Sequence, residues 1–117
     1  MALPTVAPAK SRTAASQPRT FDAASLAVLK EALASKDYAT RLVAVEALGE
    51  AKLDSAVPWV EHALGDTEHD VRMAGVEALD RVHSTHALVL LATVRDDTTE
   101  ELDIRAVVAG ALLRTTP

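Results

Sequence analysis

The sequence of 117 residues contains no cysteine and only one residue each of tryptophan, tyrosine and phenylalanine. The lack of cysteine excludes disulfides, thiolate nucleophiles and cysteine-ligated zinc or iron–sulfur sites. Hydrophobic residues nevertheless make up 49 % of the chain, so the core must be built from Ala, Val and Leu. Since Ala and Leu favour helices, and four glycines and five prolines leave few breaks, we predict an all-α fold.

Long apolar runs are also lacking. None reaches the roughly 20 residues that span a bilayer. The first nine residues are too few and too interrupted by proline to form the apolar segment of a signal peptide. We therefore expect a cytoplasmic protein with no membrane partner, and the lack of cysteine fits a reducing compartment.

Positive charge is scarce outside the first 20 residues. Residues 1–20 carry Lys10, Arg12 and Arg19 and no acid, whereas residues 21–117 carry 9 basic and 17 acidic residues. An acidic domain repels nucleic-acid phosphates, so we expect no nucleic-acid partner. Residues 1–20 hold three of the five prolines and show no helix or strand period, which predicts a disordered tail. This tail is either a basic anchoring peptide or an inert extension.

The main feature of the remaining chain is an internal repeat. The segment 41–48 (RLVAVEAL) recurs 31 residues later at 72–79 (RMAGVEAL), and a weaker copy follows after a further 33 residues at 105–112 (RAVVAGAL). Apolar residues spaced i, i+3, i+7 precede each copy, as on one face of a helix. Each unit is therefore predicted to be a pair of helices. The expected helices are 23–34, 38–48, 55–64, 69–82, 85–95 and 100–113, in units of about 22–49, 54–82 and 84–114 within a domain at 21–117.

Polar residues and glycine mark the expected helix ends. Asp22 and Ser84 are placed to cap free backbone amides, and Gly49 is expected to be the left-handed residue that ends its helix. In the second helix of each unit, residues at i, i+4, i+7 and i+8 form one apolar stripe. The residues predicted to be buried on this stripe are Thr40, Ala44, Ala47, Leu48, Val71, Gly75, Ala78, Leu79, Ile104, Val108, Ala111 and Leu112.

The stretch 56–79 (AVPWVEHALGDTEHDVRMAGVEAL) resembles the short bacterial HEAT-like repeat found in bilin lyases. The resemblance covers about residues 22–114. It implies a right-handed α-solenoid of three HEAT-like helical hairpins, with the second helix of each hairpin on the concave side. Such solenoids bind other macromolecules, and the repeat itself says little about which.

The family pattern also has an Asp six residues before its Arg, and these residue types form a ladder along the stack. Asp66 and Arg72 fit this pattern. Ser35 stands at the corresponding place before Arg41, and Thr99 before Arg105, so only one rung looks complete. We expect a structural rather than a catalytic role for the three arginines.

A candidate partner-binding strip follows from the implied concave side. It is apolar and edged by acid, and it consists of Leu42, Val45, Glu46, Met73, Val76 and Glu77, with Ala106, Ala109 and Gly110 at the corresponding places of the third unit. A basic amphipathic helix or peptide with apolar anchors would suit it. The alternative is that its apolar side chains merely pack between neighbouring helices.

Two further places could hold a partner. Trp59 lies off the apolar face of its helix, and tryptophan is enriched at interface hot spots. Its alternative role is partial burial under the tail or against Tyr38. The last hairpin, with Val108 and Leu112, is apolar on nearly all sides, which favours a homo-oligomer or a protein partner at this end. The alternative is that its two helices bury each other's faces.

No catalytic or metal-binding motif is recognisable, and the four histidines are expected to be solvated. We therefore expect a non-catalytic protein–protein interaction adaptor or scaffold without a cofactor. The alternatives are a bilin-lyase-like subunit, since this repeat occurs in those enzymes, and a nucleic-acid-binding HEAT-like protein.

Overall fold

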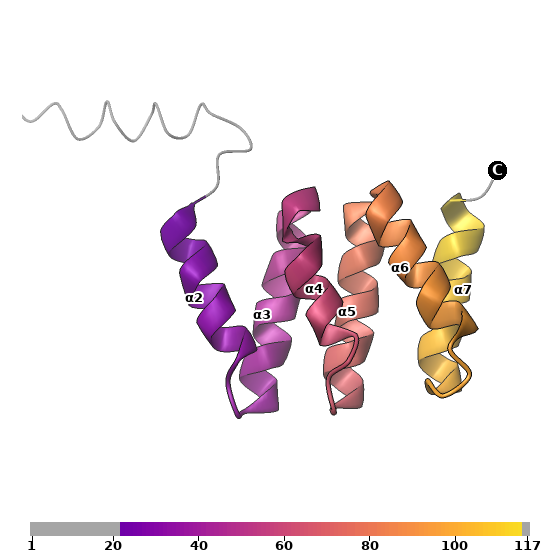
Figure 1. The fold of residues 1–117 in the computed structure, drawn as a ribbon, viewed down its shortest axis with the longest axis horizontal. Helices are drawn as coiled ribbons and strands as arrows, with labels where there is room; N and C mark the ends of the chain where they lie inside the picture. Colours follow the sequence, from indigo (N-terminus) through magenta and orange to yellow (C-terminus); the bar gives the residue numbers. More distant parts are fainter. Residues whose placement is uncertain (1–21, 116–117) are drawn as a thin grey trace, which may run out of the picture.

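The computed structural model describes residues 22–115, and all the regular structure in that range is helical. α2 (Ala23–Leu33) pairs with α3 (Tyr38–Ala51), α4 (Val57–Ala63) with α5 (His69–Val82), and α6 (Thr85–Asp96) with α7 (Leu102–Thr115), while the single turn η1 (Asp54–Ala56) leads into α4. The hairpins stand side by side, with α2, α4 and α6 in one layer and α3, α5 and α7 in the other (Figure 1). The prediction of an all-α solenoid of helical hairpins is confirmed. The predicted disordered tail lies outside the described residues.

Local sequence explains where the helices begin and end. The Asp22 carboxylate accepts a hydrogen bond from the Ser25 amide at 3.0 Å, and the Ser84 hydroxyl accepts one from the Ala87 amide at 3.0 Å, so both predicted caps are present. Pro58 lies in the first turn of α4, where its missing N–H costs no intrahelical hydrogen bond. The predicted span 69–82 is that of α5, whereas α7 begins at Leu102 rather than at 100.

The role predicted for Gly49 is wrong. α3 continues past it to Ala51, and Lys52 is the residue with left-handed backbone, at φ 54°. Gly49 is instead a close-contact position, because a Cβ on it would lie 2.8 Å from the Cβ of Ala78 in α5. The missing side chain therefore allows α3 and α5 to approach each other closely.

The core is aliphatic and continuous across the three hairpins. Its largest fully buried side chains are Val45, Val57, Val60, Val71, Val76, Leu79, Leu91, Ile104 and Val108. Most of the predicted apolar stripe is buried, but Thr40 is exposed, and Ala47 and Leu112 are only half-buried. α2 has no buried residue and packs through half-buried leucines, so the first hairpin is the least enclosed. Among the described helices, none is both long enough and apolar enough to cross a membrane.

Candidate partner-binding surfaces

An arginine at the start of α3 joins the first hairpin to the second. The Arg41 guanidinium donates from Nε and Nη2 to the two carboxylate oxygens of Asp66, at 2.8 and 2.9 Å. Its Nη1 donates to the carbonyl oxygen of Ser35 in its own hairpin, at 2.9 Å. This bidentate pair holds the pKa of Asp66 below its usual value. One side chain thus secures its own turn and the turn of the next repeat.

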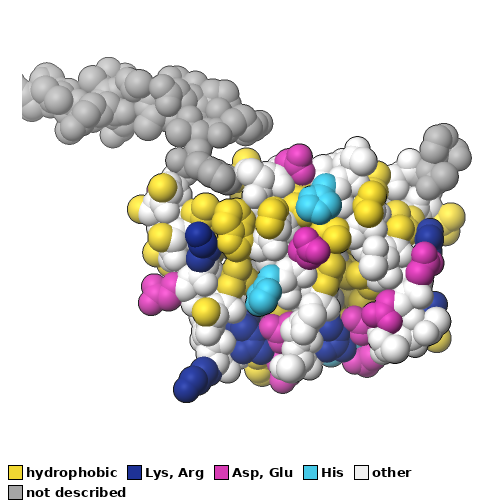
Figure 2. Space-filling model, in the orientation of Figure 1, with side chains coloured by type: hydrophobic (Ala, Val, Ile, Leu, Met, Phe, Trp, Pro, Cys, Tyr) yellow, Lys and Arg dark blue, Asp and Glu magenta, His cyan; other side chains and the backbone are white. Residues whose placement is uncertain are grey.

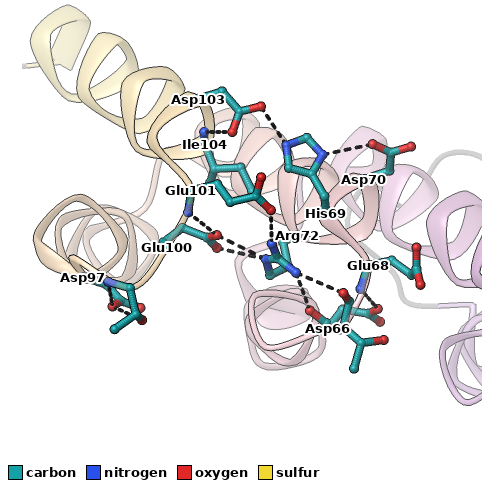
Figure 3. A network of polar contacts seen from close by, with 12 residues as sticks. Asp66, Glu68, His69, Asp70, Arg72, Asp97, Glu100, Glu101, Asp103 and Ile104 are labelled. Atoms are coloured by element: carbon teal, nitrogen blue, oxygen red, sulfur yellow. Dashed lines mark hydrogen bonds and ion pairs between the residues drawn. The ribbon is translucent and has the colours of Figure 1, made fainter.

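Arg72 repeats the arrangement one unit further along (Figure 3). Its Nη1 donates to the carbonyl oxygen of Asp66, at 2.9 Å, as Arg41 does to that of Ser35. Nε donates to Glu100 at 3.0 Å, and Nη2 to Glu101 at 2.9 Å. For both arginines the ion pairs therefore join neighbouring repeats, and the hydrogen bond to a main-chain carbonyl lies within one repeat.

The pairing expected from the family pattern is wrong in its partners. The carboxylate of Asp66 pairs with Arg41 of the preceding unit, and Arg72 binds the main chain of Asp66. The second rung is completed by Glu100, one residue after Thr99, which occupies the position of the family's Asp. An alignment that allowed one residue of slippage in the turn would have found it.

The third arginine has no such partner. Arg105 donates from Nε to the carbonyl oxygen of Arg95, at 3.0 Å, and no carboxylate among residues 22–115 forms an ion pair with it. Side-chain hydrogen bonds and, after them, the charge of Arg105 lower the pKa values of Asp96 and Asp97, which lie in the same hairpin as Arg105. Arg105 therefore forms no ion pair between repeats within residues 22–115.

His69, at the start of α5, forms a second link between repeats. Nδ1 lies 3.1 Å from Asp70 and Nε2 lies 2.7 Å from Asp103 of α7 (Figure 3). The carboxylate of Asp70 and then that of Asp103 raise the pKa of the imidazole, because they favour its charged form. His69 in turn lowers the pKa of Asp103. In its charged form the ring donates to both acids and ties α5 to α7.

The same place offers ligand types that a metal ion accepts. Ligand atoms of His69, Glu101 and Asp103 all lie within 4.8 Å of one another. Imidazole and carboxylate groups are zinc ligands, and three of them could hold an ion together with water. Glu101, however, already receives an N–H of Arg72, and a nearby guanidinium opposes a second cation. The ion pairs account for this geometry without a metal.

The predicted partner-binding strip on α3 and α5 is partly wrong. Val45 and Val76 are fully buried, so these two side chains pack between neighbouring helices and offer no surface to a partner. Leu42 and Met73 are half-buried and still reach the surface, while Glu46 and Glu77 are exposed. Leu42 and Met73 lie three residues before Val45 and Val76, which is about 60° around the helix, so they sit at the edge of the helix contact and are only partly covered.

The predicted site on the last hairpin also needs correction. Val108 is fully buried and Leu112 is half-buried, so both belong mainly to the contact between α6, α7 and the preceding repeat. The exposed apolar side chains of α7 are instead Leu102, Val107 and Leu113. The uniform hydrophobicity of residues 106–113 hid which side of the helix is covered.

Trp59 lines a groove between α2 and α4. The groove has a volume of about 360 Å³, and it is lined by Lys30, Leu33, Ala34, Pro58, Trp59 and His62. Trp59 is half-buried against the core, and Nζ of Lys30 lies 5.2 Å from the centre of its ring, a cation–π contact. Figure 2 shows this face, where hydrophobic side chains reach the surface between isolated charges. The structure brings Trp59 against α2 rather than leaving it alone in water.

These observations define a stack of helical hairpins joined by an aliphatic core and by inter-repeat ion pairs. No curated protein matches this sequence significantly. A family model described as HEAT repeats matches residues 26–112, which is most of the chain and extends from within α2 to within α7. The chain belongs to the HEAT-repeat family.

Proposed function

We propose that this domain is a non-catalytic adaptor, and that the face formed by α3, α5 and α7 binds a basic amphipathic helix or peptide of a protein partner. HEAT repeats commonly mediate protein interactions, which supports the general role. The absence of cysteine fits a cytoplasmic site of action.

The observation that carries this proposal is the row of half-exposed apolar side chains among carboxylates. Leu42 and Met73 occupy equivalent positions in α3 and α5, and each is followed four residues later by an exposed Glu, Glu46 or Glu77. Residues four apart lie on the same side of a helix, so the apolar and acidic groups of each helix share one face. Further exposed acids of these helices are Glu50 of α3, Asp70 of α5 and Asp103, which is the equivalent of Asp70 in α7.

This chemistry selects a partner of opposite charge. Leu42 and Met73 can receive apolar anchors spaced along a helix, and methionine adapts readily to different shapes. The surrounding carboxylates attract lysine and arginine at the flanks and speed association at low ionic strength. The same charges repel nucleic acid, which argues against the nucleic-acid alternative.

The Trp59 groove is a second candidate surface for the same adaptor role. It is apolar and contains the only tryptophan, but Lys30 stands over the indole ring. A partner there would have to displace this lysine, and an acidic or neutral segment would suit it better than a basic one. The two surfaces lie on opposite layers of the solenoid (Figure 1) and predict partners of opposite charge.

The non-catalytic part rests on how the polar groups are used. In the described residues, no polar or charged residue is buried, and Arg41, Arg72 and His69 are engaged in ion pairs between repeats. A bilin-lyase-like subunit remains the enzymatic alternative. The chain has no cysteine to which a bilin could attach, so the test is binding: a shift of bilin absorbance on incubation with the folded protein would favour this alternative and count against the proposal.

The binding face can be tested with a fluorescein-labelled amphipathic Leu/Lys helix and fluorescence anisotropy. The double substitution Glu46→Lys/Glu77→Lys should weaken binding at least about tenfold, as should high salt. Met73→Asp should also weaken it. Glu61→Lys, at an exposed position on α4 in the other layer, is the matched control and should change little. Equal losses for the control and the test variants, or no binding at all, would reject the proposed face.

A further inference from the structure

The outer side of α7 repeats a surface that α3 and α5 use to contact the next hairpin. Val45 of α3, Val76 of α5 and Ala109 of α7 occupy equivalent repeat positions. Val45 and Val76 are buried. One turn further along the same sides of α3 and α5, Gly49 packs against Ala78 of α5 and Asp80 pairs with Arg114 of α7.

In α7 none of residues 22–115 buries this surface. Ala109 is half-exposed, Ala106 is exposed, and Leu113, at the position of Gly49 and Asp80, is 77 % exposed. The side chains are small or apolar, as in the two filled junctions. This side of α7 therefore has the same kind of surface as the junctions within the chain, but no following hairpin among the described residues packs on it.

Arg105 lies at the repeat position of the two arginines that form ion pairs across the junctions within the chain. Arg41 and Arg72 each hold carboxylates of the following hairpin, whereas Arg105 has only the Arg95 carbonyl as a hydrogen-bond acceptor among the described residues. A structure that covers this end should therefore bring both an apolar helix face and a carboxylate.

The first hairpin offers both features at its own outer side. Val43 of α3 is 62 % exposed, whereas its equivalents are 5 % exposed in α5 (Ala74) and 39 % exposed in α7 (Val107). Asp37 is exposed and occupies the repeat position of Glu101, the residue that accepts a hydrogen bond from Arg72. Ser35 stands at the position of Asp66 and the exposed Lys36 at that of Glu100, so Asp37 is the acid available to an incoming arginine and Lys36 has to turn aside into solvent.

We propose that copies of this chain stack head to tail, with α7 of one copy packed on α3 of the next and Arg105 paired with Asp37. The stack then continues in the register of the two junctions within the chain. Because the two contacting surfaces differ, the contact is heterologous and can extend into an open chain of copies. The proposal is independent of partner binding on the α3–α5–α7 face.

Light scattering on the full chain tests the proposal. The mass should rise with concentration above the 12.4 kDa of one copy. Ala109→Glu/Leu113→Glu blocks one end and Val43→Glu blocks the other. Each variant alone should have the mass of a monomer by light scattering and the helical circular dichroism spectrum of the wild type. Mixed together they should form a 1:1 dimer and no larger species, because each retains the end that the other has lost.

Several outcomes would overturn head-to-tail stacking. A wild type that stays monomeric at all concentrations rejects it. If Val43→Glu leaves self-association intact, the contact joins two C-terminal ends instead. If the two blocked variants do not combine, the remaining ends are not complementary, and a different protein or the chain's own N-terminal segment covers α7.

Charge exchange tests the register itself. Arg105→Glu should lower the association constant at least about tenfold, and Arg105→Glu/Asp37→Arg should restore most of it. Asp37→Arg alone should weaken association by a similar factor. If the double variant associates no better than the single ones, Arg105 and Asp37 do not meet.

Discussion

Arg41 and Asp66 form a bidentate ion pair across the junction of the first two hairpins, 25 positions apart in the chain. Their side chains are only 17 % and 12 % exposed, so the pair is shielded from bulk water. In a solenoid each repeat contacts only its neighbours, and stability is therefore set by the junctions. The pair makes the turn of one hairpin part of the stability of the next.

Asp66→Asn should lower the free energy of unfolding by about 2 kcal/mol, because it leaves a partly buried guanidinium without its counter-charge. Urea denaturation followed by circular dichroism would measure it. Asp96→Asn is the matched control. It removes an acid that pairs with the adjacent Arg95 on the open surface, and it should change stability much less. If both variants lose the same amount, the Arg41–Asp66 pair has no special role.

The same pair predicts an acid dependence. The folded-state pKa of Asp66 lies below its unfolded value because Arg41 stabilises the carboxylate. The contribution of the ion pair to the free energy of unfolding is therefore present above about pH 4. It is lost as the pH falls through the lowered folded-state pKa of Asp66. The difference in stability between wild type and Asp66→Asn should shrink across this range. A difference that stays constant below pH 4 would contradict the prediction.

The two glycines of α3 and α7 should respond oppositely to alanine. Gly49→Ala places a Cβ 2.8 Å from Ala78 and forces α3 and α5 apart, with an expected loss of about 1–3 kcal/mol despite the gain in helix propensity. Gly110→Ala meets nothing within 4 Å and should raise stability by up to about 1 kcal/mol. Thermal and urea unfolding of dilute protein would measure both. A stabilising Gly49→Ala would show that α3 and α5 are further apart than described.

His69 should make stability fall as pH rises through neutrality. Asp70 and Asp103 raise its pKa, so its contribution is fully present below about pH 6.5 and is lost as the pH passes the raised folded value. Glu101 adds to the effect through its charge. The melting temperature of wild type should therefore drop between pH 6 and 8.5, and His69→Gln should flatten that drop.

The control for this prediction is His86→Gln, which removes an exposed histidine of α6 that forms no ion pair within residues 22–115. It should keep the slope of the wild type. A two-dimensional NMR titration of the imidazole signals should show a raised pKa for His69. Loss of the slope in the His86 variant would assign the pH dependence to another group.

Sequence periodicity predicted the hairpins because the apolar spacing that defines each helix is local. The span of α5 was predictable in full from its apolar period, without a side-chain cap at its N-terminus. Gly49 was misassigned because glycine suits both a helix end and a tight crossing, and only the position of Ala78 in another repeat decides between them. Information of this kind is tertiary and is not contained in the local sequence.

The candidate surfaces were harder to predict for the same reason. The exposure of Leu42 and the burial of Val45 depend on which side of α3 the next helix covers, and both residues are apolar. The pairing of Arg72 with Glu100 required the shape of the turn before α7, where the repeat slips by one residue. Charge, in contrast, was readable from the sequence, because no acidic residue in the described part of the chain is fully buried.

The single tryptophan should report which surface a basic peptide occupies. Trp59 lies in the α2–α4 layer beneath Lys30, so a peptide bound to the α3–α5–α7 face should leave its emission maximum and its quenching by acrylamide unchanged. A segment entering the groove would displace Lys30 and alter both. Lys30→Ala is the control, because it removes the competing cation and should raise acrylamide quenching without peptide. A change of Trp59 emission on adding the Leu/Lys helix, abolished by Glu46→Lys/Glu77→Lys, would show that the two layers are coupled and not independent.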